Sequence, residues 1–187
     1  MKRKLVECED DFELPKSSNL VKRYSNKIYF YSPVTKQNVL KLNELIDELN
    51  KTPYETIEVY IHSLGGDVYA GLSAMDMLFF NKKHIITIAD GFVASAATFI
   101  LLGGHEKKIF PHCDVLIHQM STESSGRYHE LKDDMENNSK LMNKMKSIYR
   151  NKTQIPIRDL NTLLEKEVVL DANQCQKWGI VNEIIIN

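Results

Sequence analysis

The sequence predicts an α/β protein, with strands packed between layers of helices. Short segments rich in β-branched and aromatic residues alternate with segments whose apolar residues recur at helical spacing. Such alternation is typical of α/β folds. A chain of 187 residues has the length of one domain and can bury a sizeable core.

The first two thirds of the chain carry this alternation. Four segments are predicted to be strands: 27–31, 56–62, 84–90 and 114–119. Three helices are predicted between them: 35–50, 68–80 and 94–102. The first of these helices has a clear apolar face, made by Val39, Leu42, Leu45, Ile46 and Leu49.

The pattern changes after Gly126. Residues 127–153 are highly charged and predict one long helix with a narrow apolar stripe: Leu131, Met135, Met142, Met145 and Tyr149. A helix of this kind buries little against its own domain, so we expect it to pack against a partner; a solvated surface helix is the alternative.

The C-terminal part predicts two shorter helices and a strand. Residues 155–167 form the first helix, with Pro156 suited to its first turn. Asp171 is expected to cap the second helix, which Gly179 ends. Residues 179–185 are predicted to close the chain as a strand.

Composition narrows the classes of function. A formal net charge of -1 gives no reason to expect a nucleic-acid partner. Cys8, Cys113 and Cys175 have no CxxC spacing, which favours a reducing compartment over a disulfide framework. The polar N-terminal stretch does not resemble a signal peptide, and no segment approaches the roughly 20 apolar residues of a membrane span. We therefore expect a cytoplasmic protein.

Motifs for metals and cofactors are absent from the sequence. The six histidines include no HExxH pair and no His/Cys cluster. Neither GxGxxG nor GxxxxGK[ST] occurs. We expect no metal and no cofactor.

Three places carry groups suited to acyl transfer, which needs a nucleophile, a base and oxyanion donors. Ser95 follows a strand and Gly91, His118 ends another strand, and Gly65-Gly66 follows a third. Strand ends and helix starts gather on one edge of an α/β fold, so these groups are expected to meet. Taken singly, each has a plainer interpretation: a packing serine, a half-buried histidine and a turn. The sequence lacks GxSxG, so it is not a standard α/β-hydrolase elbow.

Four stretches together resemble one family. In chain order they are "IHSLGGDVYAGLSAMDML", "GFVASAATFILLGG", "DVLIHQ" and "LDANQCQKWGIVNEI". They resemble ClpP, the proteolytic subunit of the Clp protease, over roughly residues 27–186. The resemblance implies a ClpP/crotonase-like fold of repeated ββα units with a protruding handle helix. It also implies a poorly matched N-terminal arm (1–26), a single peptidase domain (27–187) and a handle region at about 120–153.

The resemblance also assigns roles by position. Ser95 matches the nucleophile, His118 the general base, and the backbone N–H groups of Gly66 and Ala96 the oxyanion hole. The third, acidic member of the family's catalytic triad is an Asp, and Glu167 matches its position. Asp171 falls instead where the family has a helix N-cap. Residues matching the edges that bind substrate are Leu64, Gly65, Gln119 and Met120.

The family assembles as stacked heptameric rings, a tetradecamer that encloses polypeptide substrates. We expect a homo-oligomer of this kind here. The divergent arm leaves docking of an AAA+ ATPase open. Three alternatives stand beside a serine endopeptidase: a non-catalytic ring component, a virus-type head-maturation protease and a crotonase-type acyl-CoA enzyme. The last is disfavoured because Ser95 and His118 match the peptidase pattern.

Overall fold

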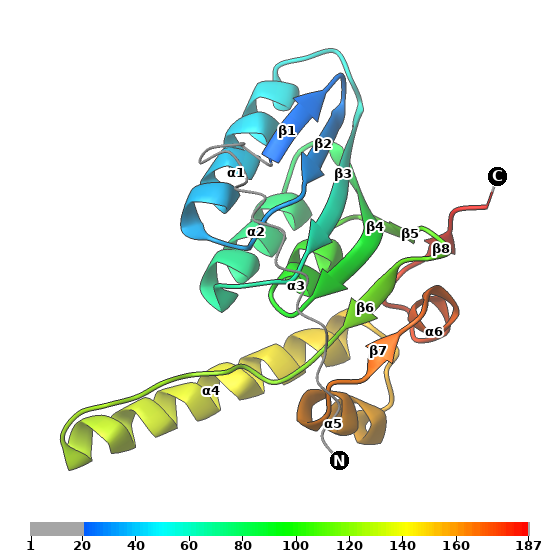
Figure 1. The fold of residues 1–187 in the computed structure, drawn as a ribbon. Coiled ribbons are helices and arrows are strands. Elements are labelled where there is room, and N and C mark those ends of the chain that lie inside the picture. Colours follow the sequence, from blue (N-terminus) through cyan, green and yellow to red (C-terminus); the bar gives the residue numbers. More distant parts are fainter. Residues whose placement is uncertain (1–20, 187) are drawn as a thin grey trace, which may run out of the picture.

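The computed structural model describes residues 21–186, which form one eight-stranded sheet with helices packed on it (Figure 1). The predicted α/β class is confirmed. The main path of the sheet runs, in spatial order, through β1 (Val21–Tyr24), β2 (Lys27–Phe30), β3 (Thr56–Ser63), β4 (His84–Ala94), β5 (Glu106–Ile109) and β8 (Glu183–Ile184). Only the β1–β2 pair on this path is antiparallel.

The sheet branches along β4. Residues 86–89 of β4 pair with β5, whereas residues 92–94 pair with β6 (Asp114–Leu116). β6 in turn pairs antiparallel with β7 (Val169–Leu170). Between the two halves lies Gly91, at φ +67, where a Cβ would come within 2.5 Å of the His62 ring. The C-terminal end of β4 therefore pairs with β6 instead of β5.

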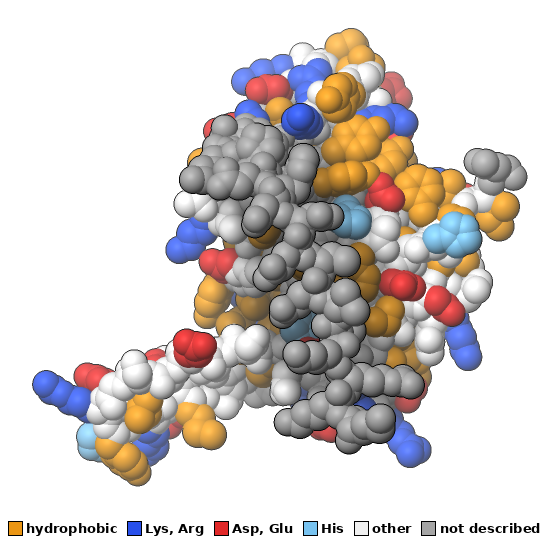
Figure 2. Space-filling model, in the orientation of Figure 1, with side chains coloured by type: hydrophobic (Ala, Val, Ile, Leu, Met, Phe, Trp, Pro, Cys, Tyr) orange, Lys and Arg blue, Asp and Glu red, His pale blue; other side chains and the backbone are white. Residues whose placement is uncertain are grey.

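Three helices cover one face of the sheet (Figure 1): α1 (Lys36–Asn50), α2 (Val68–Phe79) and α3 (Ala97–Leu102). α1 is capped by the Thr35 side chain and buries the five apolar residues predicted for it. β3 alternates, with Ile57, Val59 and Ile61 buried beneath the helices. On the opposite face the rings of Tyr29 and Tyr60 stack 4.9 Å apart, and hydrophobic side chains gather over this part of the sheet (Figure 2).

A long helix, α4 (Tyr128–Lys152), projects from the body of the molecule, as predicted (Figure 1). The preceding segment runs along it. The buried residues of α4 lie toward its C-terminal end: Leu141, Met145 and Tyr149. Met135, in the predicted stripe, is 73% exposed, so the preceding segment covers the outer half of α4 only in part.

The C-terminal part packs at the base of α4. It contains α5 (Ile157–Glu165), with Pro156 as its N-cap, and α6 (Ala172–Lys177). The predicted cap is confirmed, because the Asp171 side chain accepts a hydrogen bond from the Gln174 N–H at 2.8 Å.

Several predicted boundaries were wrong. The predicted 94–102 helix starts at Ala97 because β4 continues through Gly91 to Ala94. The 114–119 strand ends at Leu116, the 155–167 helix covers only Ile157–Glu165, and the closing strand is reduced to β8. β5 and β7 were missed because they are short and bury one residue each.

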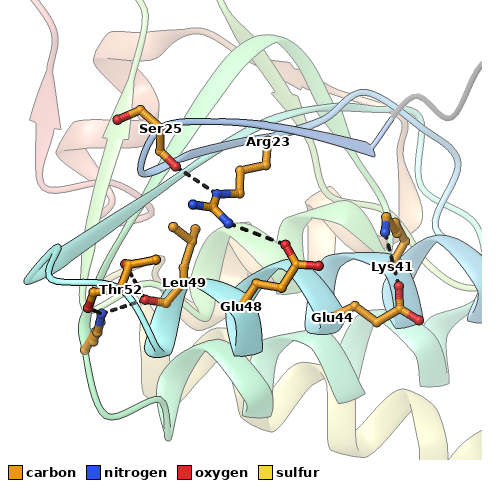
Figure 3. Close-up of polar contacts among 8 residues, drawn as sticks. Arg23, Ser25, Lys41, Glu44, Glu48, Leu49 and Thr52 are labelled. Carbon is orange, nitrogen blue, oxygen red and sulfur yellow. Dashed lines mark hydrogen bonds and ion pairs between the residues drawn. The ribbon is translucent and has the colours of Figure 1, made fainter.

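Part of the predicted N-terminal arm belongs to the sheet. Residues 21–24 form β1, and Arg23 in it reaches Glu48 on α1 at 3.4 Å (Figure 3). The arm's remaining residues up to 20 lie outside the described part of the chain. Among residues 21–186, no helix has both the length and the apolar character that a membrane span needs. In the same range, no group of three or more His, Cys, Asp or Glu residues is arranged to hold a metal ion.

Candidate active site

Ser95 lies in a tight turn between the end of β4 and the start of α3. Its φ of +54 is a left-handed value, which within residues 21–186 only one other non-glycine residue, Ser25, adopts. Such a conformation costs of order 1–3 kcal/mol and occurs both in tight turns and at functional sites. Ser95 is half-buried, whereas Ala96, Ala97 and Thr98 after it are buried. A residue that served packing alone would need neither the strain nor the exposure.

Hydrogen bonds fix the backbone on both sides of Ser95. Its N–H donates to the Leu116 carbonyl of β6 at 2.9 Å. Its carbonyl accepts from the Thr98 N–H at 3.0 Å and from the Thr98 hydroxyl at 2.6 Å. The turn is thus held by the sheet branch on one side and by α3 on the other.

The Gly65-Gly66 loop lies directly against this turn. Both glycines have left-handed φ values, +95 and +145. The Val34 N–H donates to the Gly65 carbonyl at 2.8 Å, and the Asp67 N–H donates to the Val34 carbonyl at 2.8 Å. Within residues 21–186, neither the Gly66 N–H nor the Ala96 N–H donates a hydrogen bond. The structure therefore brings together a hydroxyl and two backbone donors without partners in the described chain.

His118 lies two residues beyond the end of β6, and within residues 21–186 no hydrogen bond joins its ring to the Ser95 hydroxyl. The Ser95 N–H bonds to Leu116, and His118 follows two residues later, half-buried. The Gln119 N–H donates to the Leu164 carbonyl of α5 at 2.9 Å, which anchors the chain just beyond His118. Met120 lines one side of an open groove of about 520 Å³ against α4.

The two acidic residues considered from the sequence, Glu167 and Asp171, have different surroundings. β6 and β7 pair Val115 with Leu170 and Leu116 with Val169. The pairing ends at Leu116 and Val169, and the Val168 N–H donates to the Lys166 carbonyl at 2.9 Å, so the chain turns at Glu167 and only the sequence pattern relates Glu167 to His118. Glu167 is exposed, and no hydrogen bond joins it to His118 in the described chain. Asp171, by contrast, uses its carboxylate to cap α6.

Sequence reasoning missed two supporting groups. The backbone of Val34 forms an isolated bridge with Gly66, and the Ser63 hydroxyl accepts the Gly65 N–H at 3.1 Å. The contact with Val34 carries no local sequence signal because it joins segments 32 positions apart, whereas Ser63 lies only two residues before Gly65. The predicted edge residue Leu64 is 77% exposed beside this loop.

Comparison with known proteins identifies the family. The family model described as Clp protease matches residues 16–187. This chain belongs to the Clp protease family. An ATP-dependent Clp protease proteolytic subunit of Ostreococcus tauri is 30% identical over 167 residues, 81% of this chain and 84% of that protein. One of Oltmannsiellopsis viridis is 31% identical over 128 residues, which span 67% of this chain and 66% of that protein, just under two thirds of its length.

A solved structure supports the fold. A point mutant of ClpP1 from Listeria monocytogenes matches with a TM-score of 0.78 at 22% identity, covering 87% of this chain and 92% of that one. The family and the ClpP-type fold expected from the sequence motifs are both confirmed. The two relatives described above are named as proteolytic subunits, so this chain is a homologue of Clp peptidase subunits.

Proposed function

We propose that this Clp family member is a serine endopeptidase that hydrolyses peptide bonds in peptides and unfolded polypeptides. One observation carries the proposal: Ser95 sits at φ +54, half-buried, beside two backbone N–H groups that have no acceptor within residues 21–186. A strained, accessible hydroxyl next to free donors is the arrangement that acyl transfer requires.

In the proposed mechanism the Ser95 hydroxyl attacks the substrate carbonyl while His118 takes its proton. The negative charge that develops on the carbonyl oxygen is stabilised by the N–H groups of Gly66 and Ala96. His118 then protonates the leaving amine, and water hydrolyses the acyl-enzyme by the same steps in reverse. Glu167 would hold the His118 ring in the orientation this proton transfer needs.

Substrate is proposed to bind as an extended strand. The proposed edges are the segments Leu64-Gly65 and Gln119-Met120, in which Leu64 and Gln119 are exposed. The Gly65 N–H and carbonyl and the Gln119 N–H already bond within the chain, so pairing would use the other backbone groups of these segments. Pairing with such edges supplies backbone hydrogen bonds that do not depend on the substrate's sequence.

Assembly into stacked heptameric rings is part of the proposal. The outer half of α4, with Leu131 and Met135 exposed, projects from the body and fits the role of the handle (Figure 2). The two curated relatives are named as subunits of ATP-dependent proteases. Cytoplasmic location is proposed from the sequence pattern: the cysteine usage and the absence of a signal-peptide pattern and of an apolar stretch as long as a membrane span.

A second candidate function is a non-catalytic ring component. It is favoured by the exposure of Glu167 and by the lack of a hydrogen bond between Glu167 and His118 within residues 21–186. An unsupported imidazole would be a poor base.

Cleavage of a fluorogenic peptide by the purified protein separates the two functions. Ser95→Ala is assayed alongside, and particle mass is measured by light scattering. Turnover that disappears in Ser95→Ala, together with fluorophosphonate labelling of Ser95, supports the endopeptidase. Absence of both from an intact oligomer would leave the non-catalytic role.

A further inference from the structure

A buried pair of hydroxyl groups lies directly behind the Ser95 turn. Thr98, in the first turn of α3, and Tyr149, near the end of α4, are 0% and 1% exposed. The Thr98 Oγ1 lies 2.6 Å from the Ser95 carbonyl oxygen and 2.6 Å from the Tyr149 hydroxyl. The Tyr149 ring also packs against Phe99, with ring centroids 5.4 Å apart.

Chemistry fixes the direction of both hydrogen bonds. A threonine hydroxyl has one hydrogen, and the Ser95 carbonyl can only accept. Thr98 must therefore donate to Ser95, and the Tyr149 hydroxyl must donate to Thr98. Burial raises the pKa of Tyr149 well above its usual value, so the tyrosine keeps this proton throughout the ordinary pH range.

The Ser95 carbonyl belongs to the same peptide group as the Ala96 N–H. A trans peptide is planar, so its carbonyl and N–H point in opposite directions and turn together. A hydrogen bond that holds the Ser95 oxygen inward, toward Thr98, therefore aims the Ala96 N–H outward. That N–H is one of the two donors without an acceptor in the described chain.

We propose that Thr98 and Tyr149 are positioning residues that orient the Ala96 N–H of the oxyanion hole through the Ser95 carbonyl. The inference rests on the proposed endopeptidase function. Neither side chain touches substrate in this proposal. They act, together with the Thr98 N–H, by limiting rotation of one peptide group at the strained Ser95 turn.

The size of the effect follows from the contacts that remain. Removing an oxyanion donor altogether costs about 100- to 1,000-fold in kcat. After Thr98→Val, the Thr98 N–H still holds the Ser95 carbonyl at 3.0 Å. We therefore expect kcat to fall by about 10-fold, with KM little changed because the substrate-binding edges are intact. Tyr149→Phe, which leaves the Thr98 hydroxyl in place, is expected to have a smaller effect in the same direction.

The chain offers a matched control. Thr87, also 0% exposed, donates its hydroxyl to the Leu101 carbonyl at 2.7 Å, at the other end of α3. Thr87→Val thus removes the same kind of buried hydrogen bond without touching the Ser95 peptide. Thr98→Ser is the rescue variant, since it keeps the hydroxyl that donates to Ser95.

The experiment measures kcat and KM for the four variants on the assembled protein, with hydrogen exchange of the 95–98 segment followed by mass spectrometry. The proposal expects lower kcat and faster exchange in Thr98→Val, recovery of both in Thr98→Ser, and neither change in Thr87→Val. Equal kcat losses in Thr98→Val and Thr87→Val, or unchanged exchange in Thr98→Val, would overturn it. If the unmodified protein has no turnover while Thr98→Val still exchanges faster than Thr87→Val, the peptidase assignment fails and the positioning of the peptide stands.

Discussion

Gly65 lies so close to Ser95 that a Cβ at position 65 would come within 2.6 Å of the Ser95 Cβ. The same atom would lie 2.7 Å from the Ala94 carbonyl oxygen. The glycine loop after β3 and the serine turn after β4 are therefore one packed unit. The proposed oxyanion donors on either side of the contact, Gly66 and Ala96, keep their relative position through it.

The first prediction is that Gly65→Ala abolishes peptide cleavage and lowers stability. The new methyl group meets backbone and Cβ atoms that cannot move aside, and alanine at φ +95 is strained in addition. We expect a loss of about 2 kcal/mol or more in the free energy of unfolding, measured by urea titration.

Gly179→Ala is its control. Gly179 has φ +64, but an added Cβ would meet chiefly the side chain of Gln154, remote from Ser95. It should cost about 1 kcal/mol and leave kcat unchanged. Retained activity in Gly65→Ala would mean that the two loops move independently.

A second prediction concerns the strain at Ser95. Ser95→Ala and Ser95→Gly should both abolish fluorophosphonate labelling, but Ser95→Gly should be the more stable by about 1 kcal/mol, because glycine adopts φ +54 without steric cost. Thermal unfolding of the two variants measures the difference.

Ser25 provides the matched comparison, since its φ of +56 is nearly the same and it lies in the β1–β2 turn. Ser25→Gly should exceed Ser25→Ala in stability by a similar amount, with activity retained in both. Equal stability of Ser95→Ala and Ser95→Gly would show that position 95 leaves the left-handed conformation once the serine hydroxyl is removed.

Sequence alone predicts those elements whose signal is local. α1 was predicted with its buried face because five apolar residues repeat at helical spacing. β5 was missed because Glu106, Lys107 and Lys108 leave only Ile109 buried. The start of α3 was misplaced because Phe92, Val93 and Ala94 suit a strand or a helix equally, and pairing with β6 decides for the strand.

For the candidate site, residue types could be predicted but not their geometry. Motifs in family order pointed to Ser95 and His118. The left-handed turn at Ser95 depends on tertiary contacts to Leu116 and Thr98. The hydrogen bond between Tyr149 and Thr98 joins residues 51 positions apart, so no local sequence pattern predicts it.

A third prediction follows from the buried thiol of Cys113. Burial, with smaller contributions from the charges of Asp90 and Asp114, raises its pKa from 9.0 to about 12. The unfolded thiol ionises above about pH 9 while the folded one stays protonated. The stability that this group contributes is therefore present below pH 9 and lost as the pH rises toward 12.

Urea unfolding at about pH 8 and pH 10 tests this on the parent and on Cys113→Ala. The parent should lose about 1 kcal/mol more than the variant between the two pH values. The cavity that Cys113→Ala leaves lowers the free energy of unfolding equally at the two pH values, so it does not affect this difference. An identical loss in the two proteins would mean that the Cys113 thiol is not protected from ionisation by the fold.

The last prediction separates the two candidate acids. Glu167 matches the position of the acid in the family pattern, while Asp171 accepts the Gln174 N–H as the cap of α6. Glu167→Gln should lower kcat without loss of stability, because the amide cannot stabilise the protonated imidazole. We expect a fall of about 10-fold or more, and a larger loss in His118→Ala, since an exposed acid assists the base but does not replace it.

Asp171→Asn is the isosteric control. Asparagine caps helices as well as aspartate does, so both stability and kcat should be retained, whereas Asp171→Ala should cost about 1 kcal/mol with kcat unchanged. Steady-state kinetics and urea unfolding on all four variants distinguish the roles. A larger fall in kcat for Asp171→Asn than for Glu167→Gln would assign the acid to Asp171 instead. Equal falls for Glu167→Gln and His118→Ala would make Glu167 a full partner of the base, because the imidazole would then be inactive without it.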